Sequence, residues 1–298
     1  MATLYTHAES NTKKTWILLT GFVLFIIFLG WFFSYLLDDS VFLIVAVILS
    51  IVQSFASYWY SDKIVLAITG AKEIKKSDNP ELYRLVENLS ITAGLPLPKI
   101  YIINEAQPNA FATGRDEKHA VIAVTRGLLE KLERVELEGV IAHELSHIGN
   151  KDMLLGSVLV VLVGIVALLS RMFLRFLRFG GGRGRGKKSR GSGLIFLVLG
   201  ILGAVLAPIV ASLIRLSISR KREFLADATG GLLTRYPEGL ARALEKISQD
   251  PNPMRKMDNS TVHLYILNPF KKRDWLSKLF STHPPIEERT RALRGMKV

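Results

Sequence analysis

The stretch VELEGVIAHELSH, residues Val135 to His147, is the part of the sequence around which the rest of the chain is organised. It places His-Glu-x-x-His in a run of helix-forming residues. Because a helix turns by about 100° per residue, side chains four positions apart lie on one face, so His143 and His147 can direct their imidazoles at one metal ion. Glu144 lies beside that ion and is free to act as a base. The stretch therefore predicts a rigid helix that carries a zinc site.

A second segment, Ser219 to Asp227, can complete this site, because it carries carboxylates at Glu223 and Asp227 on another predicted helix. Two histidines need a third protein ligand if the fourth position is to stay open for water, and Glu223 can be that ligand. Asp227 can accept the outer N–H of a ligand histidine. A solvated charged face is the alternative for this pair. An arrangement with a third histidine is excluded, because Met153 stands where that histidine is required.

The composition indicates a membrane protein. The chain has 298 residues, of which 49% are hydrophobic, and a net charge of +13. It contains no cysteine, which excludes disulfides and a cysteine-zinc cage. The basic residues cluster beside long apolar runs, so we interpret the charge as an affinity for membrane lipids and expect no nucleic-acid partner.

Four apolar runs organise the chain. The first two, residues 16–37 and 41–60, are each about as long as a bilayer is thick, which predicts a transmembrane hairpin over 16–60 behind a cytoplasmic N-terminus, residues 1–15. Lysines stand on both outer sides of this hairpin while its turn is acidic, so both outer ends are predicted to be cytoplasmic. The third and fourth runs, 153–170 and 194–214, predict a second hydrophobic hairpin over 153–214.

The basic Gly/Arg loop between the last two runs, residues 171–193, raises a conflict. A metal shared by His147 and Glu223 places both ends of the second hairpin in one compartment, which puts the basic loop outside, against the positive-inside rule. The alternatives are that the two runs insert only partly, or that they pack against the protein and the membrane surface. The segment 181–188 is similar to a phosphate loop, but Lys188 stands where Ser or Thr is required, so no nucleotide site is expected.

The remaining segments, residues 61–152 and 215–298, are typical of a folded catalytic domain in two parts. Residues 108–114 are predicted as an edge strand that can pair with an extended peptide, with an ordinary hairpin strand as the alternative. Pro284 and Pro285 fix a turn that presents His283 in a defined direction. Helices are further predicted over 80–93, 238–248, 273–280 and 286–296, and strands over 99–103 and 120–125.

Taken together, four motifs resemble the HtpX membrane metalloproteases, which are relatives of the prenyl-protein CaaX proteases. The motifs are His143–His147, Glu223–Asp227, Pro108–Gly114 and Thr282–Pro285, in this order and among four apolar runs. The fold expected is mainly α with a small β-sheet, in which two helical membrane hairpins accompany a zincin-like (gluzincin) catalytic domain. The resemblance implies one zinc ion per chain and a multi-pass protein of the cell membrane with a cytoplasmic catalytic domain.

The resemblance also implies roles for single residues. Asn109 and Ala110 belong to the substrate-binding edge strand, and His283 is a candidate stabiliser of the transition state. The implied activity is cleavage of misfolded membrane proteins in stress-related quality control. The basic Gly/Arg loop departs from the family pattern and leaves the topology of the second hairpin in doubt.

Three other functions remain alternatives: a dedicated processing protease of one membrane partner, a hydrolase acting on something other than peptides, and a non-catalytic membrane scaffold with structural zinc. The scaffold is disfavoured because structural zinc sites usually have four protein ligands, and Glu144 would have no purpose in it.

Overall fold

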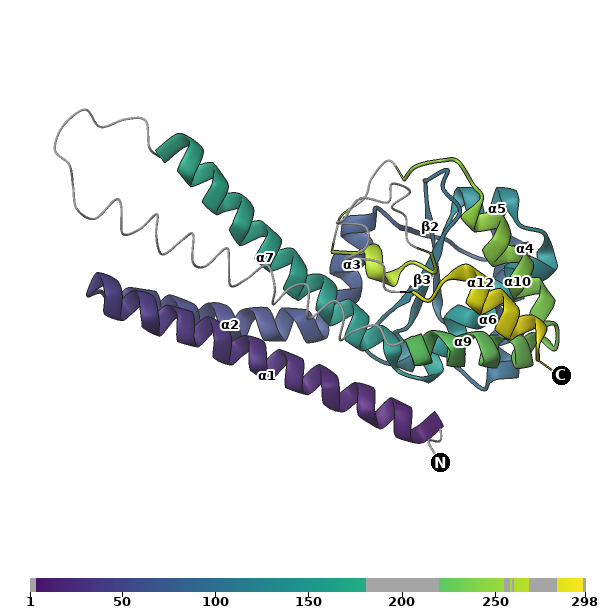
Figure 1. Ribbon diagram of the computed structural model, residues 1–298, viewed down its shortest axis with the longest axis horizontal. Helices are drawn as coiled ribbons and strands as arrows, with labels where there is room; N and C mark the ends of the chain where they lie inside the picture. Colours follow the sequence, from purple (N-terminus) through teal and green to yellow (C-terminus); the bar gives the residue numbers. More distant parts are fainter. Residues whose placement is uncertain (1–3, 181–219, 255–257, 259, 268–282, 297–298) are drawn as a thin grey trace.

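The computed structural model describes residues 4–180, 220–254, 258, 260–267 and 283–296. Two long helices, α1 (Leu4–Leu37) and α2 (Val41–Trp59), lie side by side and project from a mixed part, which we call the α/β part and which comprises residues 61–149 and the described residues from 220 onward (Figure 1). The predicted apolar run 194–214 and the predicted helix 273–280 lie outside the described residues.

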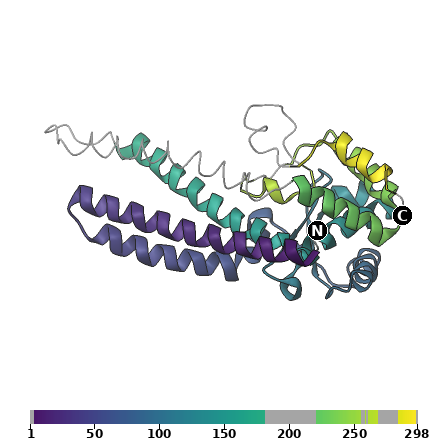
Figure 2. The same cartoon turned by 60° about the horizontal axis from the view of Figure 1, so that its bottom comes forward.

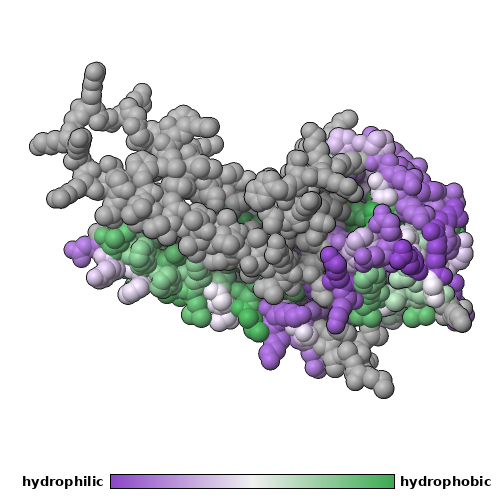
Figure 3. All heavy atoms as spheres, in the orientation of Figure 1, coloured by the Kyte–Doolittle hydropathy of each residue, from purple (hydrophilic) through white to green (hydrophobic). Residues whose placement is uncertain are grey.

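The two projecting helices have the length and composition of membrane spans. Glu9–Leu36 and Val41–Trp59 are 28 and 19 residues long, and each is apolar enough to cross a bilayer. Gly30 allows them to approach closely, since a Cβ built there would lie 2.2 Å from the Cβ of Ala46. Figure 3 shows hydrophobic surface along this hairpin and mainly hydrophilic surface on the α/β part. The first predicted hairpin is therefore present in the structure, and the chain is a membrane protein.

The sheet of the α/β part has four strands in the order β1-β2-β4-β3. These are β1 (Lys72–Glu73), β2 (Lys99–Ile103), β3 (Ala110–Thr113) and β4 (Val121–Thr125). β2 and β4 are parallel, whereas β3 pairs with β4 antiparallel, with Ala110 opposite Val124 and Thr113 opposite Val121. β3 therefore forms an edge of the sheet, as the sequence predicted.

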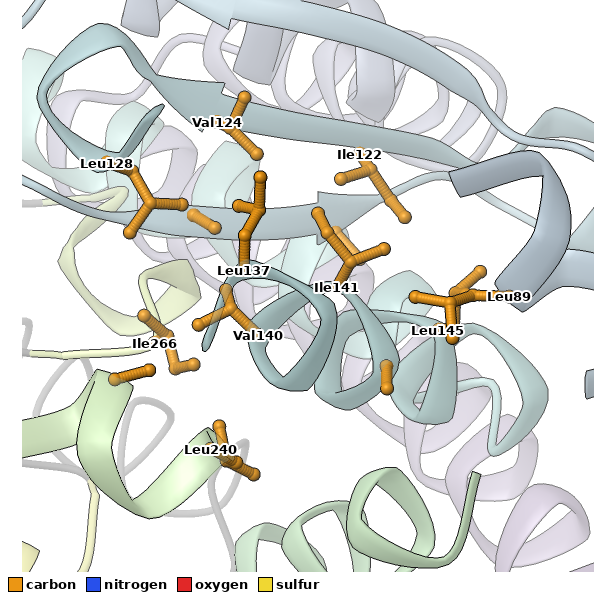
Figure 4. Packing of buried hydrophobic residues seen from close by; sticks show 14 of the residues in the cluster. Leu89, Ile122, Val124, Leu128, Leu137, Val140, Ile141, Leu145, Leu240 and Ile266 are labelled. Atoms are coloured by element: carbon orange, nitrogen blue, oxygen red, sulfur yellow. The ribbon is translucent and has the colours of Figure 1, made fainter. Parts of the chain in front are cut away.

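Helix α6 (Arg134–Gly149) lies across this sheet and is buried on almost all sides. Leu137 and Ile141 lie beside Val124 and Ile122 of β4, as Figure 4 shows, and Val140 belongs to the same buried cluster. α10 (Pro237–Ser248) covers the opposite side, where a Cβ at Gly139 would lie 2.7 Å from the backbone N of Leu240. Full burial of one aliphatic side chain, such as that of Ile141, stabilises the fold by about 1.5–3 kcal/mol. The several buried side chains of α6 therefore hold this helix rigidly.

The remaining described elements surround α6 and the sheet. The predicted helix 80–93 and strand 99–103 are confirmed with the same bounds as α4 and β2. The other elements are α3 (Ser61–Thr69), α4 (Pro80–Ala93), η1 (Glu117–His119), α5 (Arg126–Lys131), α9 (Arg220–Thr234), η2 (Val262–Leu264) and α12 (Ile286–Arg294).

Helix α7 (Asp152–Gly180) corrects one prediction. The chain turns by 84° between α6 and α7, and the helix continues through residues 171–180, which were predicted as part of the basic loop. The glycines and basic residues that predict a loop begin in earnest at Gly180, whereas residues 171–179 contain neither glycine nor proline and are rich in Leu, Met and Arg, which favour a helix. Residues 153–166 are mostly buried, with Leu154, Val158 and Leu162 packed against α1. Most of the third apolar run thus lies against α1, which is itself a candidate membrane span.

Candidate metal centre

Helix α6 is fixed at its N-terminal end by a capping box in which the carboxylates of Glu133 and Glu136 each accept a backbone N–H. Glu136 is fully buried, and its carboxylate lies 2.8 Å from Nζ of Lys246 and 3.3 Å from Nη2 of Arg242, both on α10. These ion pairs compensate the buried charge and lock α10 onto α6. The rotation of α6 about its axis, and with it the direction of its histidine-bearing face, is therefore fixed about two turns before His143.

The structure brings His143, His147 and Glu223 together, as the two motifs predicted. Their ligand atoms all lie within 4.8 Å of one another. The two Nε2 atoms are 3.1 Å apart, and the carboxylate oxygens of Glu223 lie 3.8 Å from Nε2 of His143 and 3.7 Å from Nε2 of His147. Ligands of a tetrahedral zinc ion with bonds near 2.05 Å are separated by roughly 3.3 Å. The donor set and its spacing thus fit zinc, with one coordination position left open.

Close contact between α9 and α6 makes this meeting possible. A Cβ built at Gly230 would lie 3.0 Å from the backbone N of His143, so a larger residue would push α9 away from the metal helix. Because Gly230 has no side chain, α9 can lie directly against α6 at this point, about two helical turns after Glu223. Helix packing, and not the spacing of Glu223 along the chain, therefore completes the group.

Each histidine has its own carboxylate behind it. Oδ1 of Asp227 lies 3.0 Å from Nδ1 of His143, and Nδ1 of His147 donates to Oδ2 of Asp152 at 3.0 Å. Such partners orient the ring, so that Nε2 faces the metal, and raise its basicity as a ligand. Asp227 lies close to Nδ1 of His143, where the motif predicted it, although this contact lacks the geometry of a hydrogen bond. Sequence reasoning missed Asp152, since it follows the bend after α6 and its position depends on that bend.

Arg289 on α12 is a second residue that sequence reasoning missed. Its guanidinium is fully buried and donates to both carboxylate oxygens of Asp227, from Nη2 at 2.7 Å and from Nε at 2.8 Å. Nη1 also donates to the backbone oxygen of Ile266 at 3.1 Å. A bidentate pair of this kind fixes geometry as well as charge. The signal that could have found it is its spacing, since Arg289 lies three residues after Ile286 and four before Leu293, on the apolar face of α12.

The surroundings shift the pKa values of His143, His147 and Glu223 in different directions. Burial lowers the pKa of His143. Burial also disfavours a charge on His147, but the hydrogen bond to Asp152 and the carboxylate of Glu223 raise the pKa of His147 to about 9. Against the same burial, the imidazole of His283, together with His147 and the Arg289 guanidinium, holds the pKa of Glu223 well below its usual range. Glu223 is therefore a carboxylate at neutral pH, ready to bind a cation.

Glu144 is the one carboxylate of the group whose pKa rises. Burial, reinforced by the nearby Glu223 carboxylate, raises the pKa of Glu144 to about 7. The backbone N–H of Ala112 on β3 donates to the Glu144 carboxylate, which holds it between the edge strand and the metal ligands. A carboxyl group with a pKa near neutrality, lining the same pocket as the ligands, has the properties of a general base that later acts as an acid.

His283 lies against the metal ligands. Its Nδ1 donates to Oε2 of Glu223 at 2.8 Å. Its Nε2 is buried and has no hydrogen-bond partner among the described residues. His283 also lines the pocket at the site. The side chain therefore supports a metal ligand with one nitrogen, and its other nitrogen is available to a substrate.

The predicted peptide-binding residues, Asn109 before β3 and Ala110 at its start, contact another part of the chain. Nδ2 of Asn109 donates to the backbone oxygen of Leu267 at 3.0 Å, and the backbone N–H of Ile266 donates to the oxygen of Ala110 at 3.0 Å. The pocket at the metal ligands has a volume of about 60 Å³ and is also lined by Ile266. This is room for a few water molecules. An extended peptide would reach Asn109 and Ala110 only if residues 265–267 moved.

Comparisons with known proteins identify the family of this chain. The model of peptidase family M48 matches residues 76–297. The chain is 44% identical over 301 residues to a "Protease HtpX homolog" of Caldanaerobacter subterraneus subsp. tengcongensis, which covers 99% of each chain. It is 50% identical over 256 residues to the corresponding protein of Syntrophobacter fumaroxidans, which covers 85% of this chain and 89% of that one.

Among solved structures, the crystal structure of S. mikatae Ste24p matches 97% of this chain and 66% of its own, with 21% identity and a TM-score of 0.49. The family match includes all three candidate metal ligands and the buried carboxyl group beside them. The chain therefore belongs to peptidase family M48, as a membrane metalloprotease of the HtpX type.

Proposed function

We propose that this protein is a zinc endopeptidase that hydrolyses misfolded or damaged membrane proteins without ATP. The observation that carries the proposal is the group formed by His143, His147 and Glu223 with Glu144 beside it. Zinc held by these three ligands would supply Lewis-acid activation of a water molecule and of the scissile carbonyl. The scaffold alternative is disfavoured, since the group offers three protein ligands and a separate carboxyl group with a pKa near 7.

Glu144 and His283 have distinct roles in this proposal. The Glu144 carboxylate takes a proton from the attacking water and passes it to the leaving amine, for which a pKa of about 7 is well matched. In its protonated form His283 donates through Nε2 to the carbonyl oxygen as negative charge develops there, while Nδ1 keeps its hydrogen bond to Glu223. A donor placed in this way is worth about 3 kcal/mol of transition-state stabilisation.

The edge strand supports a peptide substrate. Ala112 lines the pocket at the metal ligands and lies on the edge strand β3. Once residues 265–267, which contact Ala110, have moved, an extended peptide that pairs with this edge passes the Glu144 carboxyl group. Pairing between backbones recognises an extended chain and not particular side chains, which implies cleavage at many sites with weak sequence preference. Membrane lipids hold the enzyme near its substrates through the α1–α2 hairpin, and the α/β part faces the cytoplasm.

The test uses the full-length, zinc-loaded protein in detergent, without ATP. We expect it to degrade a casein-like unfolded chain and a destabilised membrane protein and to spare a stable soluble domain, whose open population is too small. A chelator should stop cleavage and added zinc should restore it. Cleavage confined to one bond of a single partner would replace this proposal with a dedicated processing protease. Zinc binding without any peptide hydrolysis would favour a scaffold or a hydrolase of another substrate class.

A further inference from the structure

One face of α1 connects the membrane hairpin to the α/β part. Its polar beginning consists of Asn11 and Thr15, both buried. Figure 2 shows the N-terminal end of α1 beside the α/β part, while the rest of the hairpin projects away from it. The same face continues into the hairpin with apolar residues that pack against α7, namely Leu19, Phe22 and Ile26. The helix that starts the hairpin thus lies on the first turns of α7, immediately after the metal helix.

Asn11 binds the elbow at which α6 passes into α7. It is 2% exposed, and its Nδ2 donates to the backbone oxygen of Asn150 at 3.1 Å and to Oδ1 of Asp152 at 2.6 Å. Between these two residues, Lys151 has a φ of 55°, in the left-handed region that residues other than glycine rarely adopt. One amide group therefore holds both sides of a strained elbow.

The carboxylate of Asp152 connects this elbow to the metal group. Its Oδ1 accepts from Asn11 and, at 3.1 Å, from Nη1 of Arg222, which leaves Oδ2 to accept from Nδ1 of His147 at 3.0 Å. Nη1 of Arg222 also lies 3.4 Å from Oδ1 of Asn11, to which it donates. Asn11 and Arg222 thus fix one oxygen of Asp152, and this sets the direction of the other toward the ligand imidazole.

We propose that Asn11 is a positioning residue for the metal centre: it docks the start of α1 on the α6–α7 elbow and fixes the Asp152 carboxylate that orients His147. The first membrane helix is then a structural component of the metal site, and its docking and the zinc affinity are linked. This inference rests on the proposed function for zinc binding by His143, His147 and Glu223, and it does not depend on the substrate.

Zinc affinity of the full-length protein in detergent, measured by competition with a chromophoric chelator, tests the proposal. Asn11→Leu keeps the approximate size of the side chain and removes its hydrogen bonds. We expect it to weaken zinc binding at least about threefold, and less than the roughly 10–100-fold expected of Asp152→Asn. The visible spectrum of the cobalt-substituted protein should change as well, because it reports the ligand geometry and not overall stability.

Thr15→Val is the matched control. Thr15 is buried on the same face one turn later, and its hydroxyl donates within α1 itself, to the backbone oxygen of Asn11 at 2.9 Å. We expect wild-type zinc affinity and an unchanged cobalt spectrum for this variant. Should Asn11→Leu not fold, Asn11→Ser retains a small polar side chain that is too short to bridge Asn150 and Asp152, and the same losses are expected.

A double variant separates a positioning role from a general loss of packing. If Asn11 acts through Asp152, Asn11→Leu should add little to the effect of Asp152→Asn. Additive effects, or zinc affinity and a cobalt spectrum equal to those of the wild type in the Asn11 variants, would overturn the proposal. A wild-type protein that binds zinc but cleaves no peptide would refute the proposed function and leave this test intact.

Discussion

Arg289 binds Asp227 through two parallel contacts, Nη2 to Oδ1 at 2.7 Å and Nε to Oδ2 at 2.8 Å, and Asp227 in turn contacts His143. This connects α12, near the C-terminal end, to the metal helix in the middle of the chain. The pair is almost completely buried, and the guanidinium holds the pKa of Asp227 down, at about 2, against the effect of burial. The carboxylate behind His143 thus depends on a cation from a distant segment.

Arg289→Met should destabilise the protein and weaken zinc binding together. The variant leaves the Asp227 carboxylate buried without its cation, and removal of one partner of a buried ion pair typically costs about 3–5 kcal/mol. Zinc affinity should fall roughly 10–100-fold because the partner of His143 is no longer held. Denaturant unfolding and chelator competition measure the two effects. Arg294→Met is the control on the same helix, since its exposed pairs with Glu238 and Glu245 should contribute far less.

Glu144→Gln should abolish proteolysis while zinc stays bound. The glutamine has nearly the same shape but cannot take a proton, and we expect the rate of hydrolysis to fall about 10²–10⁴-fold. Glu223→Ala should instead lose both zinc and activity, because it removes a ligand of the candidate site. Metal analysis of the two purified variants decides the assignment. Loss of zinc from Glu144→Gln would show that Glu144 is a ligand and not the base.

Zinc binding should strengthen as the pH rises. The pKa of His147 is raised to about 9, so below that pH the imidazole holds a proton that zinc has to displace. The apparent affinity should therefore increase by roughly tenfold per pH unit from neutral pH and level off near pH 9. Asp152→Asn removes a principal cause of the raised pKa, so its affinity should level off at a lower pH. A wild-type affinity that does not change between about pH 7 and 9 would contradict this account.

The sequence predicts a feature well when residues close together along the chain determine it. α4 and β2 were predicted with the correct bounds, because caps, periodicity and prolines act within a few residues. The same holds for His143 and His147, whose spacing on one helix brings them together. Glu223 required a pattern match between two segments, since packing of α9 against α6 is not visible in the spacing itself.

The residues that were missed are those placed by tertiary structure alone. Asp152 reaches His147 only because the chain turns by 84° after α6, and Asn11 reaches Asp152 only because α1 packs against α7. Arg289 is one of several charged residues on an amphipathic helix, and its burial follows from the position of Asp227. For Arg289 the spacing with Ile286 and Leu293 marks the buried face, but the partner that compensates its charge is not visible in the sequence.

The orientation of the α/β part in the membrane can be tested with single cysteines, because the chain has none of its own. Ser10, Ser77 and Ser248 are exposed at the N-terminal end of α1 and on both parts of the α/β part, and Ser40 is exposed in the turn of the hairpin. If α1 and α2 each cross the membrane, Ser40 lies on the side opposite the other three. From the lysines at both outer ends of the hairpin, the positive-inside rule leads us to expect that side outside the cell.

An impermeant thiol reagent applied to intact cells should therefore label Ser40→Cys and leave Ser10→Cys, Ser77→Cys and Ser248→Cys unlabelled until the cells are opened. Ser77 and Ser248 belong to the two segments that supply His147 and Glu223, so a shared zinc ion requires them to behave alike. Labelling of one of these two in intact cells without the other would contradict the common metal centre. Labelling of both, with Ser40→Cys protected, would keep the metal centre and reverse the orientation. Zinc retention by each variant provides the control that the α/β part is folded.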